Sequence, residues 1–280
     1  MYFCHSIARD RTKRVTKAIN NESEAAKQEY SFMQKALAFS VHVFTATGVI
    51  TAILAIIAIS NAAIPGADHG NHMRWAMLWL FLAQVIDGVD GAFARLFKAR
   101  EVLPDWDGKA IDYVIDFATY AIIPAFFLYQ SGILPQQWAF PAICLLLMVS
   151  ALYYGKEGMV SNDYHFIGFP VMWNMTAFYM YFITELPPYV NLAVIVIVSI
   201  MHFIPVKYPY PSRTKEFQIP NVFFAVVFVI VNVWILFNYP IKHPWLQWMS
   251  IGCLAYYALV SAYYTATYGK AEQKISSSPS

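Results

Sequence analysis

Charged residues are scarce in this chain. Asp, Glu, Lys and Arg make up only 13% of its 280 residues, whereas hydrophobic residues make up 59%, and the mean hydropathy is +0.46. A typical soluble domain carries about 25% charged residues, so this composition excludes an ordinary soluble protein and predicts an integral membrane protein. The formal net charge is only +2. We expect membrane lipid around the chain and no nucleic-acid partner.

Cysteine is also rare, because the chain has only Cys4, Cys144 and Cys253, far apart from one another. Two of the three lie in apolar runs, where a cysteine usually acts as a small core residue. This pattern predicts neither a disulfide framework nor a metal–thiolate site.

The apolar core of a signal peptide is missing from residues 1–30, which are polar and basic. We expect a cytosolic N-terminal segment there, either a solvated tail or one that lies on anionic lipid. Residues 269–280 end in SSSPS and predict a disordered cytosolic tail. Residues 31–268 predict one membrane-embedded domain, with no internal repeat and no soluble domain.

Eight apolar segments predict an all-α, polytopic fold with about eight transmembrane helices. Most segments have about the ~20 residues that a helix needs to cross a bilayer, and prolines fall at their ends. The segments are 34–60, 73–98, 110–131, 136–154, 167–184, 187–206, 221–239 and 244–267.

The distribution of Lys and Arg predicts the orientation. Eight spans place both termini on one side of the membrane, and that side collects seventeen of the nineteen basic residues, leaving only Arg74 and Lys242 on the other. Cytoplasmic loops carry an excess of Lys and Arg, so we expect both termini in the cytoplasm. The short loop between the second and third spans is then cytosolic as well.

Four aspartates stand at the two ends of the stretch from 87 to 116. Asp87 and Asp90 are an i, i+3 pair, and Asp112 and Asp116 are an i, i+4 pair, so each pair projects from one face of its helix. Facing helices would bring four carboxylates together, which requires protonation or neutralising cations. Oxygen ligands with no Cys or His nearby favour Mg²⁺ or Mn²⁺.

Small residues and an arginine surround the first pair, at Gly88, Gly91, Ala94 and Arg95. Small side chains let a ligand or another helix come close, and the planar guanidinium fork of an arginine suits phosphate. Together with a metal, this pattern indicates a bound diphosphate.

The sequence from Asp87 to Asp116 resembles the signature of the CDP-alcohol phosphatidyltransferases. Asp87-x-x-Asp90-Gly91-x-x-Ala94-Arg95, twelve further residues and Gly108-x-x-x-Asp112-x-x-x-Asp116 reproduce it without a departure, over about a tenth of the chain. Within that family, Gly88 and the twelve-residue gap most resemble the bacterial phosphatidylcholine synthases, which join choline to CDP-diacylglycerol.

The resemblance implies phosphatidyl transfer from CDP-diacylglycerol to choline, with CMP as the second product. It implies two Mn²⁺ or Mg²⁺ ions held mainly by Asp87, Asp90 and Asp112, with Asp116 as the general base that also shares a metal. It further implies a homodimer in the bacterial inner membrane, with its active site facing the cytoplasm. Thr45 and Gly48 in the first span resemble residues that face the nucleotide, although Thr and Gly also serve close helix packing.

Aromatic residues are the main candidates for the acceptor pocket. A quaternary ammonium binds to aromatic ring faces. Tyr120 lies on the Asp116 face of its helix, and Trp173, Tyr113 and Asn174 are the next candidates. Lys207, Arg213 and Lys215 could bind a lipid phosphate or a serine carboxylate, or could simply follow the positive-inside rule.

Three alternatives remain at this point. The acceptor could be another alcohol such as serine. The aspartates could form buried ion pairs with Arg95, Lys98 or Lys109, although intramembrane ionisable groups usually mark a functional site. The chain could also be an ion-coupled transporter, but such proteins typically show repeats and broken helices that we do not find in this sequence.

Overall fold

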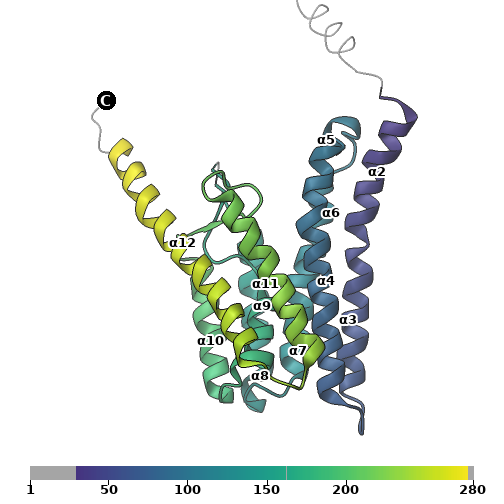
Figure 1. The fold of residues 1–280 in the computed structure, drawn as a ribbon, viewed down its shortest axis with the longest axis vertical. Helices are drawn as coiled ribbons and strands as arrows, with labels where there is room; N and C mark the ends of the chain where they lie inside the picture. The colour runs from purple at the N-terminus through teal and green to yellow at the C-terminus, as the bar shows by residue number, and fades with distance from the viewer. Residues whose placement is uncertain (1–29, 162, 277–280) are drawn as a thin grey trace, which may run out of the picture.

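The computed structural model describes residues 30–161 and 163–276, with side chains to 267. The first 29 residues of the expected basic segment and the last four of the expected tail lie outside this part. The chain is mostly helical, and its helices form an elongated bundle (Figure 1). We call each run of one or more consecutive helices that extends along this bundle a rod.

The second and third rods carry the signature, and the first rod lies beside them. α2 (Phe32–Ala46) and α3 (Gly48–Ala62), separated only by Thr47, form one column, and α4 (His69–Leu96) returns beside it (Figure 1). A short α5 (Ala99–Val102) leads to the third rod, which consists of α6 (Gly108–Asp116), the π-helix η1 (Phe117–Ile122) and α7 (Ile123–Gln130).

Side-chain caps explain where these rods begin. The Asp68 carboxylate accepts a hydrogen bond from the backbone N–H of Asn71 at 3.0 Å, and Asp107 accepts one from the N–H of Lys109 at 3.0 Å. Each cap satisfies a backbone donor that the first helical turn leaves free. The Asp107 cap starts α6 just before Gly108 and so sets the helical register of the second aspartate pair.

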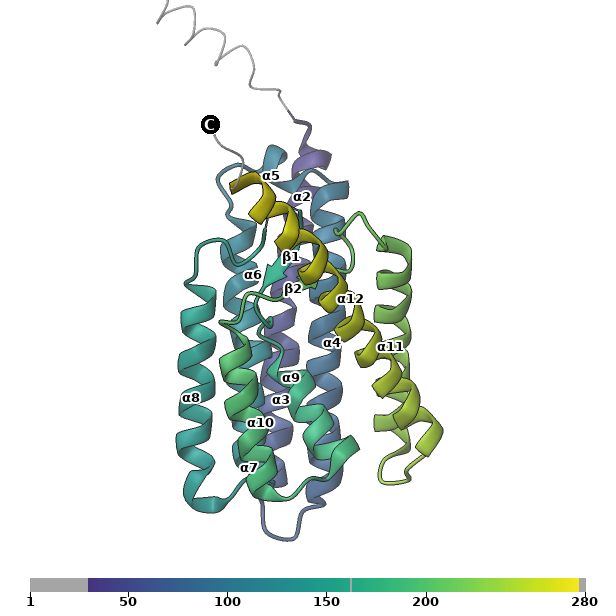
Figure 2. The same ribbon diagram turned by 90° about the vertical axis from the view of Figure 1, so that its left-hand side faces the viewer.

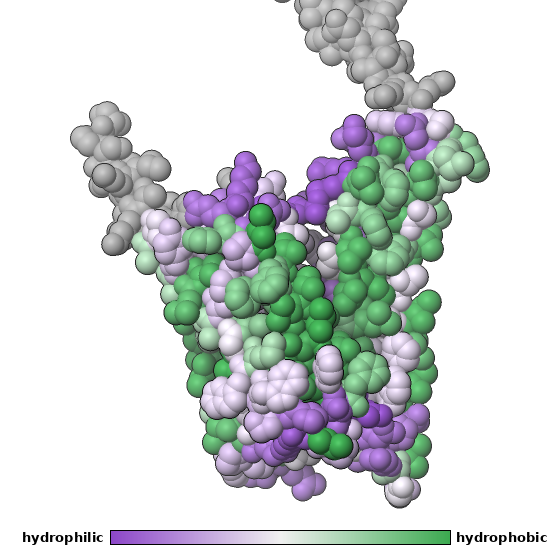
Figure 3. Space-filling view, viewed as in Figure 1, coloured by the Kyte–Doolittle hydropathy of each residue, from purple (hydrophilic) through white to green (hydrophobic). Residues whose placement is uncertain are grey.

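The remaining rods are α8 (Gln136–Tyr154), α9 (Trp173–Phe178) continued by the π-helix η2 (Tyr179–Thr184), α10 (Pro188–Met201), α11 (Gln218–Asn238) and α12 (Pro244–Ser276). Successive rods run in opposite directions, so both ends of the described chain lie at the same end of the bundle (Figures 1 and 2). A broad apolar belt separates two polar ends, and the surface is hollowed toward its upper end (Figure 3).

Five helical stretches are long and apolar enough to cross a membrane: Phe32–Ala62, His69–Leu96, Gly108–Gln130, Gln136–Tyr154 and Gln218–Asn238. They confirm the first four predicted segments and the seventh. The fifth and sixth segments contain shorter helices, and the count of eight spans stays a prediction. α12 continues as helix to Ser276, beyond the predicted start of a disordered tail at 269, which is consistent with the helix-forming residues KAEQK at 270–274.

A small β-ladder departs from the purely helical prediction. β1 (His165–Ile167) pairs antiparallel with β2 (Lys207–Pro209), with Phe166 opposite Tyr208. The fifth predicted segment therefore becomes helical only at Trp173. Figure 2 shows α12 crossing this ladder at the same end of the bundle as α5.

Candidate active site

α4 and α6 bring three of the four aspartates together. One carboxylate oxygen from each of Asp87, Asp112 and Asp116 lies within 4.8 Å of the others, and all three residues are partly buried. The two helical spacings place the carboxylates on facing surfaces, as the sequence predicts. Oxygen atoms this close can coordinate one hard divalent cation together.

Asp90 lies outside this group of three and has its own partner. Its carboxylate is buried, at 6% exposure, and its Oδ2 accepts a hydrogen bond from the Thr45 hydroxyl at 2.8 Å. Thr45 reaches it from α2, where its hydroxyl also lies 3.2 Å from the carbonyl oxygen of Val41. The structure therefore gives Thr45 a role in orienting Asp90.

Tyr120 also contacts an aspartate. Its buried hydroxyl donates a hydrogen bond to Oδ2 of Asp87 at 2.7 Å. Tyr120 belongs to η1, the π-helical segment that begins directly after Asp116. Single-turn π segments are often found at functional sites, and this one places the tyrosine against the facing α4.

The glycines near the aspartates serve different purposes. A Cβ added at Gly88 would meet nothing within 4 Å, whereas one added at Gly91 would lie 3.4 Å from Nη1 of Arg95. A Cβ at Gly48 would lie only 2.8 Å from Cγ2 of Ile115. Gly48 therefore permits close contact between α3 and α6, while Gly88 leaves open space beside the aspartates.

The other three small or basic signature residues lie at the C-terminal end of α4 and at the start of α6. Ala94 packs against the small cluster of Ala38, Ala99 and Val102, and Arg95 is exposed. A Cβ on Gly108 would lie 2.8 Å from Cε1 of His42. This glycine thus lets α2 approach the beginning of α6.

The loop after β2 carries charge and aromatic rings toward the aspartates. Burial raises the pKa of Tyr210 to about 12, the negative charges of Asp87 and its neighbours add to the rise, and Arg213 opposes it. The guanidinium carbon of Arg213 lies 5.3 Å from the ring centre of Tyr210 and 5.7 Å from that of Tyr164. Arg213 is exposed and close enough to Asp112 for their charges to interact.

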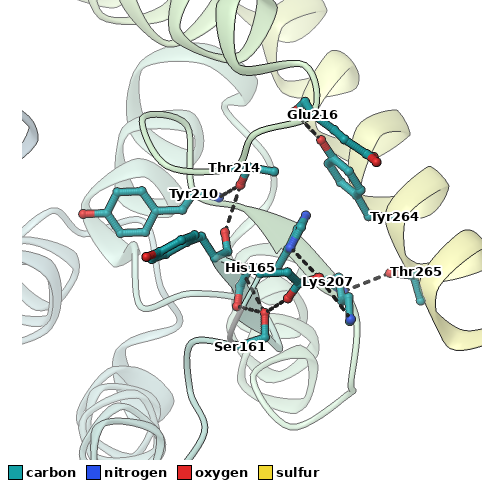
Figure 4. Close-up of polar contacts among 10 residues, drawn as sticks. Ser161, His165, Lys207, Tyr210, Thr214, Glu216, Tyr264 and Thr265 are labelled. Atoms are coloured by element: carbon teal, nitrogen blue, oxygen red, sulfur yellow. Dashed lines mark hydrogen bonds and ion pairs between the residues drawn. The ribbon is translucent and has the colours of Figure 1, made fainter. Parts of the chain in front are cut away.

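Hydrogen bonds hold this loop in place (Figure 4). The Thr214 hydroxyl donates to the carbonyl oxygen of Tyr164 at 2.9 Å and accepts from the backbone N–H of Tyr210 at 3.0 Å. The Tyr264 hydroxyl of α12 donates to the carbonyl oxygen of Glu216 at 2.6 Å. Figure 4 shows the ring of Tyr210 pointing away from the strands.

The three basic candidates differ in their surroundings. The ammonium of Lys207 lies 3.5 Å from the carboxylate of Asp163 and is mostly buried, and its backbone N–H donates to Thr265 at 2.9 Å. Arg213 and Lys215 are exposed. Arg213 lies close enough to Asp112, an aspartate of the signature, for their charges to interact.

The aromatic and amide candidates for the acceptor pocket differ in how far other residues cover them. Trp173 is 0% exposed, its indole N–H donates to the Ser150 hydroxyl at 2.8 Å, and its ring stacks on His202. Asn174 is equally buried, and its amide donates to Gln84 at 3.3 Å. Both side chains are therefore enclosed by protein. Tyr113 is 43% exposed on α6.

Two tyrosines near the aspartates were missed from the sequence. Tyr154, at the end of α8, lies close enough to Asp116 for electrostatic interaction, and Tyr210 approaches Asp87 from the loop. Both tyrosines lie far beyond the signature in the sequence, and their separation from the aspartates matches no helical repeat. No local spacing could therefore identify them.

Comparisons with known proteins agree with the site. The family model described as CDP-alcohol phosphatidyltransferase matches residues 41–206, more than half of the chain. A protein of Rhizobium meliloti named phosphatidylcholine synthase is 38% identical over 210 residues, which are 74% of this chain and 82% of the relative. Proteins of the same name from Pseudomonas aeruginosa and Legionella pneumophila are 34% and 32% identical, over 80% and 85% of this chain and 90% and 92% of the relatives.

The matched range holds the C-terminal part of α2, all of α3 and α4, all four aspartates and β1, so the similarity includes the helices that carry the aspartates and the part of α2 that carries Thr45. The chain therefore belongs to the CDP-alcohol phosphatidyltransferase family.

Proposed function

We propose that the chain transfers a phosphatidyl group from CDP-diacylglycerol to choline, giving phosphatidylcholine and CMP. Membership of the family supports the phosphatidyl transfer, and relatives named phosphatidylcholine synthase support choline as the acceptor. The observation that carries the proposal is the group of three carboxylates, Asp87, Asp112 and Asp116, within 4.8 Å of one another between two apolar helices.

The donor set fits hard divalent cations. Asp87, Asp90 and Asp112 offer carboxylate oxygens, which Mg²⁺ and Mn²⁺ prefer, and Asp116 can share a metal with them. Bound metal, two ions in our proposal, would offset the charge of the diphosphate and of the departing CMP. Gly88, Gly91, Ala94 and Arg95 are proposed to lie beside that diphosphate.

Asp116 is the proposed general base. It accepts the proton of the choline hydroxyl, and the choline oxygen forms a bond to the phosphorus that carries the diacylglycerol. The bond from that phosphorus to the bridging oxygen breaks, and CMP leaves with the bridging oxygen. A base placed at the attacking hydroxyl typically contributes 10²–10⁴-fold to the rate.

The orientation follows from the charges of the described residues. The loops and helix ends on the side of the bundle that holds both chain ends carry Lys35, Arg95, Lys98, Arg100, Lys109, Lys156, Lys207, Arg213 and Lys215, whereas those on the opposite side carry Arg74 and Lys242. The positive-inside rule makes the first end cytoplasmic. We therefore propose an inner-membrane protein with eight spans, cytoplasmic termini and a cytoplasmic active site, and a homodimer as the resemblance implies.

The test is an acceptor comparison. Purified protein with CDP-diacylglycerol and Mn²⁺ is offered choline, serine, inositol and glycerol 3-phosphate in turn, and the lipid product is identified by mass spectrometry. We expect phosphatidylcholine with choline and little product with the others. A better yield with serine would overturn the choline assignment and leave the transferase chemistry, while absence of any lipid product would overturn both.

A further inference from the structure

Three aromatic rings meet beside the catalytic aspartates. The ring centres of Tyr113 and Phe117 lie 5.9 and 5.8 Å from that of Tyr154, with interplanar angles of 66° and 88°. Both pairs are therefore edge-to-face contacts, in which the ring faces point in different directions. Aromatic rings gathered in this way can together contact one small cation.

The third rod places this aromatic corner next to the carboxylates. Tyr113 and Phe117 follow Asp112 and Asp116 by one residue each, so the two pairs share the i, i+4 spacing. One residue turns an α-helix by about 100°, which makes the aromatic face the neighbour of the carboxylate face. Both faces therefore border one site.

Tyr154 closes the corner from a different helix. It lies at the end of α8, close enough to Asp116 for electrostatic interaction. Its ring is partly exposed, and within the described residues its hydroxyl makes no hydrogen bond. The ring is therefore free to contact a ligand, and the nearby carboxylates favour a cationic one.

The other aromatic candidates are already engaged. The Tyr120 hydroxyl is bonded to Asp87, and Trp173 is fully buried against His202 and Ser150. Tyr120 and Trp173 are 6% and 0% exposed, whereas Tyr113 is 43% exposed. The ring of Tyr210 is covered by the Arg213 guanidinium, whose carbon lies 5.3 Å from the ring centre.

We propose that Tyr154, with Tyr113 and Phe117, binds the quaternary ammonium of the acceptor and thereby determines acceptor specificity. This inference rests on the proposed function, since it assigns a place to the choline of that reaction. Choline is short, so an ammonium held by the rings leaves its hydroxyl within the neighbourhood of Asp116. A fixed positive charge with methyl groups needs no hydrogen-bond partner, whereas a primary ammonium or a carboxylate does.

The experiment compares ring removal with ring retention. Tyr154→Leu removes the ring, and Tyr154→Phe keeps it without the hydroxyl. Tyr113→Leu is a second removal at a partly exposed position, where a poor fold is less of a concern. Tyr129→Leu is the matched control, because Tyr129 is 45% exposed at the far end of the same rod.

We expect the two ring removals at the corner to raise the KM for choline by about two- to thirty-fold each and to leave the KM for CDP-diacylglycerol nearly unchanged. Tyr154→Phe and the control should keep the choline KM. The inhibition constant of tetramethylammonium, which carries the ammonium without a hydroxyl, should rise in parallel with the choline KM. Monomethyl- and dimethylethanolamine should lose less from Tyr154→Leu than choline does.

A choline KM that is unchanged in both Tyr154→Leu and Tyr113→Leu overturns the inference and leaves the proposed function intact. A Tyr154→Phe variant as impaired as Tyr154→Leu also overturns it, because the hydroxyl would then be the group that matters. If the unaltered protein does not use choline at all, the acceptor comparison has already removed both the function and the inference.

Discussion

The hydroxyl of Tyr120 donates a hydrogen bond of 2.7 Å to the carboxylate of Asp87. This bond joins the π-helical part of the third rod to α4 and fixes one carboxylate of the three-aspartate group. A partner that orients a metal ligand contributes to metal affinity without touching the metal.

Tyr120→Phe removes only this hydroxyl. We expect the Mn²⁺ concentration that gives half-maximal activity to rise by about 10–100-fold, since loss of such orienting bonds typically costs this much in metal affinity or activity. A titration of activity against Mn²⁺ measures it, with Tyr129→Phe as the control at an exposed tyrosine of the same rod. An unchanged Mn²⁺ requirement would show that the bond does not orient a metal ligand.

Asp116→Asn keeps the shape of the side chain and removes its basicity. Turnover should fall by about 10²–10⁴-fold, while the KM for CDP-diacylglycerol stays close to that of the unaltered protein. Asp112→Asn, which alters a proposed metal ligand on the same helix, should instead weaken binding of metal or CDP-diacylglycerol as well as the rate. If Asp116→Asn loses binding with no separate defect in turnover, Asp116 is an ordinary ligand and not the base.

Removal of divalent metal should abolish activity, because neighbouring carboxylates at low dielectric require neutralising cations to stay ionised together. EDTA should stop product formation, and added Mn²⁺ or Mg²⁺ should restore it. EDTA saturated with Mn²⁺ beforehand is the control and should have no effect. Full turnover in excess free chelator contradicts the proposed metal site.

Gly48→Ala should destabilise the protein by about 1–3 kcal/mol, since the added Cβ would lie 2.8 Å from Ile115 in a packed helix contact. Gly88→Ala is the matched control, because its Cβ meets nothing within 4 Å and alanine favours the helix. The midpoint of thermal unfolding in detergent measures both. Equal stability of Gly48→Ala and the unaltered protein would mean that α3 and α6 separate at little cost. A stable Gly88→Ala variant with reduced activity would support substrate contact at Gly88.

The β-ladder should weaken in acid. Burial raises the pKa of Asp163, but the bonds and charges of Ser161, His165 and Lys207 outweigh it and hold the pKa below the ordinary 3.8. A lowered folded-state pKa contributes stability above pH 3.8 that is lost as the pH falls through the folded value. The difference in unfolding midpoint between the unaltered protein and Asp163→Asn should therefore shrink between about pH 5 and pH 3. A difference that stays constant over this range contradicts the assignment.

Much of this protein can be predicted from neighbouring residues alone. Apolar length predicts the long spans, because a bilayer of fixed thickness requires about 20 residues of helix. The i, i+3 and i, i+4 spacings place Asp87 with Asp90 and Asp112 with Asp116 because helical periodicity is a local property. The stretch from Asp87 to Asp116 carries the family resemblance, and the comparisons with known proteins confirm that resemblance.

The tertiary structure alone decided how these faces meet. Asp90 lies outside the group of three and accepts a hydrogen bond from Thr45, and Tyr120 donates one to Asp87. Trp173 is enclosed in protein. β1 pairs with β2, which lies about forty residues later in the chain. The tertiary structure also brought Tyr154 from α8 and Tyr210 from the loop after β2 to the aspartates. The rotation of one helix against another depends on side-chain packing between segments far apart in the chain, and no local spacing records that packing.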